Sequence, residues 1–107
     1  MDVERLIQAL SRSKDLRPSR TLVEPLVEHD QRRGSDLVKT LRTFFAAGAN
    51  ASEAADRLFL HRNSMTYRME RIGKLTGLDL REPGVALALQ LGLLSLQRGE
   101  THEDEHP

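Results

Sequence analysis

The apolar residues of this 107-residue chain recur with helical spacing along most of its length. Spacings of i, i+3, i+4 and i+7 place side chains on one face of an α-helix, whereas a half-buried strand requires strict alternation. The first two stripes are Val3, Leu6, Ile7 and Leu10, and Leu22, Val23, Leu26 and Val27. The pattern therefore predicts an all-α fold, a small helical bundle of about five to six helices.

Proline and glycine residues mark the ends of the second predicted helix. The apolar pattern is interrupted from Ser11 to Ser19, and Pro25 is compatible with a helix only in its first turn. Gly34 is expected to end this helix, and Ser35 is the expected N-cap of a third one. The third helix carries Leu37, Val38, Leu41, Phe44 and Phe45 and is expected to stop at Gly48.

The segment from Asn50 to Gly77 predicts a short helix, a tight turn and a longer helix. Asn50, with Glu53 three residues later, is a variant of the capping box that opens a helix through Leu58. The longer helix is expected over about 62 to 75. The inward side chains of the first helix are small, which allows two helices to cross closely. The inward residues of the two helices are Ala51, Ala54, Ala55 and Leu58, then Met65, Met69 and Ile72.

The leucine-rich stretch after Pro83 alternates like a strand but is better explained as a helix. Only Val85 is β-branched, Ala and Leu are strong helix formers, and no second strand could pair with it. We expect a helix to about Gln97, apolar on nearly every side and therefore buried on more than one. It is compatible with a central position in the monomer and with an interface to a second subunit, with Ala88 and Gly92 permitting close approach.

Charge is distributed unevenly although the net charge is zero. Residues 57–76 hold five basic groups, Arg57, Arg62, Arg68, Arg71 and Lys74, against the single acid Glu70. Residues 100–105 hold four acidic groups. The local positive field over 57–76 suits a phosphate backbone. Residues 99–107, which lack apolar side chains, are expected to form a disordered acidic tail.

The outer face of the longer helix has the composition of a recognition helix. Arg62 and Asn63 can read guanine and adenine edges, respectively. Thr or Ser can reach a base or a phosphate, and Arg68, Arg71 and Lys74 suit phosphates, as do Asn50 and Ser52 at the start of the shorter helix. A basic amphipathic helix can also be a plain solvated surface. The alternative is therefore a helical protein–protein interaction or dimerisation module, in which Leu87 to Leu96 drive association.

Three stretches resemble the C-terminal helix-turn-helix DNA-binding domain of the PucR/CdaR family of bacterial transcription regulators, a relative of the Fis-type motif. They are LVEPLVEHDQRRGSDLVKTLRTFF, LHRNSMTYRMERIGKLTGLDL and LALQL. The resemblance implies an all-helical domain that binds double-stranded operator DNA as a homodimer. It implies DNA contacts by His61, Arg62, Asn63, Ser64, Thr66, Tyr67 and Arg68. The chain departs from the pattern at Phe59, where many such motifs have Gly, and at Thr66, where family members often carry Arg.

Three regions follow from this interpretation. Residues 1–20 are expected to form an N-terminal helix and linker, 21–98 the DNA-binding domain with its motif at 50–76, and 99–107 the tail. Family members commonly carry an upstream sensory domain, for which 1–20 are too few. The sequence is compatible with a fragment of a longer regulator and with a regulator that lacks a sensor.

Other function classes find little support in the sequence. There is no Cys, and no phosphate-binding Gly loop or nucleophile elbow is present. His102 and His106 are four residues apart but lie in the predicted tail. Adjacent His29 and Asp30 point about 100° apart on a helix, which favours surface or capping roles. Without a signal peptide or a 20-residue apolar span, we expect a cytoplasmic, non-enzymatic protein without metal or cofactor.

Overall fold

The computed structural model describes the backbone of residues 17–105 and the side chains of residues 19–97. All regular structure in this part of the chain is helical, in five helices. They are α2 (Arg17–Arg33), α3 (Leu37–Ala46), α4 (Ala51–Arg57), α5 (Arg62–Thr76) and α6 (Pro83–Glu105). The predicted all-α fold is confirmed, and the helix predicted around Leu6 lies outside the described residues.

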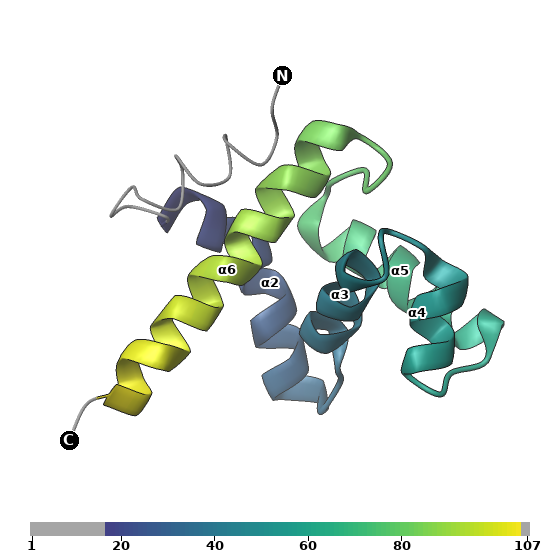
Figure 1. Ribbon diagram of the computed structural model, residues 1–107, viewed down its shortest axis with the longest axis horizontal. Coiled ribbons are helices and arrows are strands. Elements are labelled where there is room, and N and C mark those ends of the chain that lie inside the picture. The colour runs from purple at the N-terminus through teal and green to yellow at the C-terminus, as the bar shows by residue number, and fades with distance from the viewer. Residues whose placement is uncertain (1–16, 106–107) are drawn as a thin grey trace.

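The longest helix, α6, packs along α2, and α3, α4 and α5 form a second group beside them (Figure 1). One core joins the two groups, because every described helix contributes buried apolar side chains to it. Its fully buried members include Val23, Leu26, Leu41, Ala54, Ile72 and Leu89. Within residues 17–105, no helix is both long and apolar enough to cross a membrane.

Helix α2 differs from the prediction at its start and at Pro25. The helix begins at Arg17, inside the predicted break, so Pro18 lies in its first turn and Pro25 lies in its interior. Proline lacks the N–H for a helical hydrogen bond. Tertiary packing compensates here, since Val23 and Leu26 on either side of Pro25 are completely buried.

The N-terminus of α3 is capped by Asp30, six residues before the helix position that normally supplies the cap. The Asp30 carboxylate accepts hydrogen bonds from the backbone N–H groups of Leu37 (2.8 Å) and Val38 (3.0 Å). Ser35 was predicted to be the cap, but its hydroxyl donates to Asp30 instead. Gly34 ends α2 as predicted, with a positive φ of 64°, and this tight reversal brings Asp30 back to the start of α3.

Helix α6 is central to the monomer, as one of the two interpretations of the leucine-rich stretch predicted. Leu89, Leu93 and Leu96 lie on one face and are buried in the core, and Leu91 and Ser95 on another face are buried too, so the helix is covered on more than one side. Its backbone continues to Glu105, beyond the predicted end at Gln97 and through most of the stretch expected to be disordered. No proline interrupts the chain between Pro83 and Pro107, and residues 97–105 are mostly compatible with helix.

Gly92 packs closely against α2, so the close approach predicted at this residue is made within the monomer. A Cβ at Gly92 would lie 2.6 Å from the backbone oxygen of Ser19 and 3.0 Å from Cγ1 of Val23. Gly92→Ala is therefore expected to lower the unfolding free energy by about 1–3 kcal/mol, despite the better helix propensity of alanine.

The control for this prediction lies on the same helix. A Cβ at Gly84 would meet no atom within 4 Å. Gly84→Ala is expected to raise the unfolding free energy by about 0.5 kcal/mol, because alanine restricts the unfolded chain and favours the helix. Urea denaturation of both variants is the measurement. Equal effects of the two substitutions would contradict the close approach at Gly92.

Candidate nucleic-acid interface

Helices α4 and α5 form the predicted pair joined by a short turn. The Asn50 side chain accepts a hydrogen bond from the backbone N–H of Glu53 (3.0 Å), which caps α4 as the sequence predicted. The α4 side chains that face α5 and the core are small, with Ala54 and Ala55 buried. Their size lets α5 cross closely, and Met65 and Ile72 anchor α5 in the same core.

The predicted boundaries of α5 are confirmed to within a residue. The His61 side chain accepts a hydrogen bond from the backbone N–H of Asn63 (3.0 Å), so His61 is the N-cap. Gly77 closes the helix in the left-handed conformation, with a φ of 70°. Phe59, in the turn, also has a positive φ, 57°, and its side chain is 95% exposed. The turn thus keeps a left-handed residue where related motifs carry glycine, at a cost of about 1–2 kcal/mol.

Most of the predicted DNA contacts lie on the surface. Asn50 and Ser52 are exposed at the start of α4, and His61, Arg62, Asn63, Ser64, Thr66, Tyr67 and Lys74 are exposed on or just before α5. Arg68 and Arg71 are partly buried. Tyr67 stands out, because it and Phe59 are the large hydrophobic side chains that the described surface exposes.

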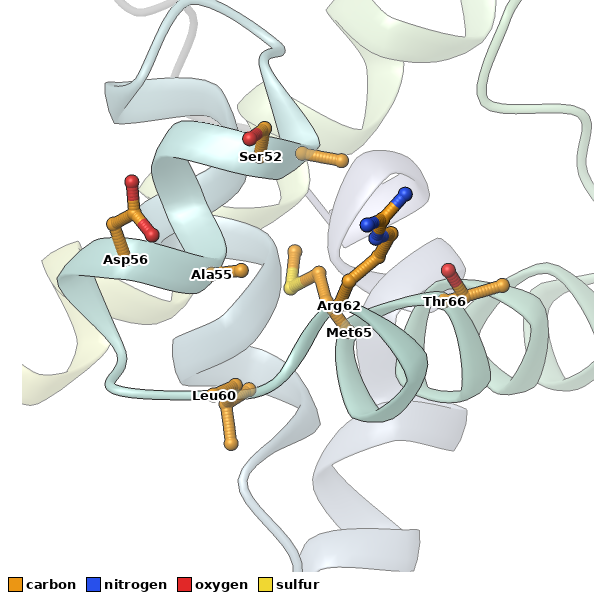
Figure 2. Close-up of a pocket in the computed structure, with 8 residues that line it drawn as sticks. Ser52, Ala55, Asp56, Leu60, Arg62, Met65 and Thr66 are labelled. Atoms are coloured by element: carbon orange, nitrogen blue, oxygen red, sulfur yellow. The ribbon is translucent and has the colours of Figure 1, made fainter.

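Two pockets divide these residues between the flanks of α5. A pocket of about 600 Å³ between α4 and α5 brings together Ser52, Arg62 and Thr66. Figure 2 shows Arg62 reaching across this pocket toward the end of α4 that carries Ser52, while the Asp56 carboxylate points away from it. The other flank holds Asn63, Ser64, Tyr67, Arg68 and Arg71 in a second pocket of about 500 Å³. Asn50, His61 and Lys74 line neither pocket.

Arg68 is held in place by α3, a feature that the sequence did not predict. One guanidinium nitrogen of Arg68 donates to Thr40 Oγ1 (3.1 Å), and Thr40 is completely buried. The Thr40 hydroxyl in turn donates to the backbone oxygen of Asp36 (2.7 Å). Because Arg has five N–H donors, the remaining ones are still available to a ligand. No spacing rule could reveal this contact, since 28 residues separate its partners.

The basic side chains of α5 form no ion pair with a carboxylate in the described part of the chain. The ion pairs there join Arg57 to Glu53 (3.0 Å) on α4 and Arg81 to Asp79 (3.1 Å) before α6. Hydrogen bonds from Arg81 hold the pKa of Asp79 below its ordinary value. Both pairs are exposed and add little stability. Arg62, Arg68, Arg71 and Lys74 therefore give α5 a positive surface that no described ion pair neutralises.

The residues of α2 and α3 beside α5 were also missed by sequence reasoning. His29, Ser35 and Asp36 line the second pocket together with Tyr67 and Arg71. The adjacent His29 and Asp30 were expected to have surface or capping roles, and the capping role of Asp30 is confirmed. Among the described residues, no group of three His, Asp or Glu side chains could hold a metal ion.

Comparisons with known proteins match the part of the chain that contains α4 and α5. The model of the PucR C-terminal helix-turn-helix domain matches residues 37–95, from the start of α3 into α6. The purine catabolism regulatory protein of Bacillus subtilis is 35% identical over 63 residues, which cover 59% of this chain and 12% of that protein. The carbohydrate diacid regulator of Escherichia coli is 43% identical over 44 residues, 41% of this chain and 11% of that protein.

A third relative is the proline-responsive transcriptional activator PutR of Bacillus subtilis, 29% identical over 69 residues, 64% of this chain and 17% of that protein. The chain thus spans less than a fifth of the length of each of these three relatives. No solved structure matches the chain significantly.

Proposed function

Since this chain belongs to the PucR C-terminal helix-turn-helix domain family, we propose that it binds specific double-stranded DNA as the output domain of a bacterial transcription regulator. In this proposal α5 lies in the major groove and operator DNA is the partner. The role requires no catalysis and no cofactor, and it is exercised in the cytoplasm, where bacterial DNA lies. The responses to purine catabolism and to proline belong to the relatives that are named for them.

The observation that carries the proposal is the set of cations on α5, which no ion pair of the described residues neutralises, on a helix anchored in the core. Met65 and Ile72 anchor the helix in the core, while Arg62 and Asn63 are exposed in its first turn. The N-terminal residues of a recognition helix reach base edges. Arg62 suits a guanine edge and Asn63 an adenine edge, since both can form bidentate hydrogen bonds.

The remaining predicted contacts are assigned to the phosphate backbone. Ser64, Arg68, Arg71 and Lys74 on α5, with Asn50 and Ser52 on α4, supply hydroxyl, amide and cationic donors. Arg68 is already oriented by its bond to Thr40, which lowers the entropy lost when it binds. Thr66 and Tyr67 lie between the two groups and can reach a base or a phosphate. His61 caps α5, so its contribution is to position the helix.

We propose that the domain acts as a homodimer with two recognition helices about 34 Å apart, on a pseudo-palindromic site. Multi-angle light scattering of the DNA complex should then give two copies of the chain per duplex. One copy per duplex at saturation, together with a monomeric free protein, would contradict the dimer without affecting the assignment of α5.

Salt-dependent DNA binding tests the proposed function directly. The protein is titrated into two labelled duplexes, one from its own promoter and a scrambled one of equal length, and binding is measured by fluorescence anisotropy. The three cationic phosphate contacts on α5 alone predict a slope of about −2.7 in log K against log salt, or about a 40-fold loss per protomer between 50 and 200 mM. Preference for the promoter duplex is also expected. A folded protein that binds neither duplex, or self-associates independently of salt, would instead support a protein interaction module.

A further inference from the structure

The flank of α5 that faces away from α4 is a built pocket, closed by residues from outside the helix-turn-helix. His29, Ser35 and Asp36 from the junction of α2 and α3 form one wall, and Ser64, Tyr67 and Arg71 from α5 form the other. The hydroxyl groups of Ser64 and Tyr67 and the guanidinium of Arg71 thus line one space, which the Asp36 carboxylate also lines. Such donors suit an oxygen-rich anion.

Arg71 has an unused donor in this region. Its Nε is buried and has no hydrogen-bond partner among the described residues. Buried donors are nearly always paired, so an unpaired one requires an explanation. A ligand in the pocket would meet the terminal guanidinium nitrogens instead of this buried Nε, because Arg71 lines the pocket and no described ion pair uses its charge.

The carboxylate of Asp30 does not line this pocket, because it is turned toward the start of α3. It accepts from the backbone N–H groups of Leu37 and Val38 and from the Ser35 hydroxyl. Ser35 has a single hydrogen and donates it to Asp30, so its 2.8 Å contact with His29 Nδ1 must be one that Ser35 accepts. The hydrogen therefore lies on Nδ1, and the imidazole ring is fixed at the edge of the pocket.

The last turn of α2 extends the positive surface beyond the pocket. Arg32 and Arg33 follow His29 by three and four residues, so they share its face of the helix. Both are exposed, and neither takes part in an ion pair of the described residues. This turn precedes residue 37, where the match to the family model begins.

We propose that the α2–α3 junction binds the phosphate backbone of the DNA strand opposite the one contacted by α4. A helix of about 10–12 Å diameter fills a major groove of about 12 Å, so phosphates of the two strands lie along its two flanks. The start of α4 lies at one flank and the junction at the other. Arg71 binds a phosphate in the pocket, and Arg32 and Arg33 bind its neighbours. This proposal rests on the proposed function.

The test is the salt dependence of binding to one duplex by the full chain and its variants. The double variant Arg32→Gln/Arg33→Gln should flatten the slope of log K against log salt by up to about 1.8, about 0.9 for each lost contact. Arg20→Gln is the matched control, because Arg20 is exposed near the other end of the same helix. It should leave the slope unchanged. Thermal unfolding checks that each variant is folded.

A third variant removes a negative charge instead of a cation, so it is expected to tighten DNA binding. Asp36 lines the pocket, is exposed and makes no side-chain capping bond, so Asp36→Asn should fold normally. If a phosphate occupies the pocket, removing this negative charge should tighten DNA binding several-fold, whereas Glu24→Gln on the outer surface of α2 should not. A steep wild-type slope that all these variants leave unchanged would overturn the junction proposal alone. No DNA binding by the wild type would overturn both proposals.

Discussion

Replacing Arg62 by alanine is expected to weaken binding to the specific operator by about 1–3 kcal/mol, roughly 5- to 150-fold, and to relax its selectivity. Arg62 is exposed in the first turn of α5, lines the pocket shared with α4 and takes part in no described ion pair. Its guanidinium can therefore form both hydrogen bonds to a guanine edge. Loss of a base contact removes discrimination, so binding to random DNA should change little.

The matched control for Arg62 is Lys74→Ala at the other end of α5. Lys74 is exposed in the last turn and is assigned to a phosphate. Its loss should weaken binding to specific and random duplexes equally and flatten the salt slope by about 0.9. Anisotropy titrations of both variants on both duplexes give the comparison. An Arg62→Ala variant that loses affinity equally on both duplexes would make Arg62 a phosphate contact instead.

The parts of the site that the sequence predicted are those whose signals are local. Asn50 caps α4, and Gly77 ends α5. Capping and termination depend on side chains and φ angles within a few residues, so they can be read from a short window. The exposed face of α5 follows from the same window once Met65 and Ile72 are assigned to the core.

The parts that the sequence did not predict depend on packing between distant segments. Pro25 is tolerated in the interior of α2 because its neighbours are buried, which no local rule reveals. The contact of Gly92 with Ser19 joins residues more than 70 positions apart. The hydrogen bond from Arg68 to Thr40 and the pocket at the α2–α3 junction also join residues that are far apart in the sequence. Each requires the three-dimensional arrangement of whole helices.

Removing the cap of α3 is expected to cause a large loss of stability. Asp30→Ala is expected to lower the unfolding free energy by about 2–3 kcal/mol, because two backbone N–H groups and the Ser35 hydroxyl lose a charged acceptor together. The loss should exceed that of an ordinary N-cap, since Asp30 also ties the end of α2 to the start of α3. Urea denaturation monitored by circular dichroism is the measurement.

Asp36 provides the control, because it occupies the N-cap position of α3 but makes no side-chain capping bond. Asp36→Ala should change the unfolding free energy by no more than about 0.5 kcal/mol. Asp30→Asn should fall between the two, since an amide oxygen can still accept from the backbone but without the charge. If instead Asp36→Ala were the more damaging substitution, α3 would be capped locally, and Asp30 would be free to face the DNA with a negative charge. The junction of α2 and α3 would then repel a phosphate, so this stability comparison also bears on the proposed contact with the opposite strand.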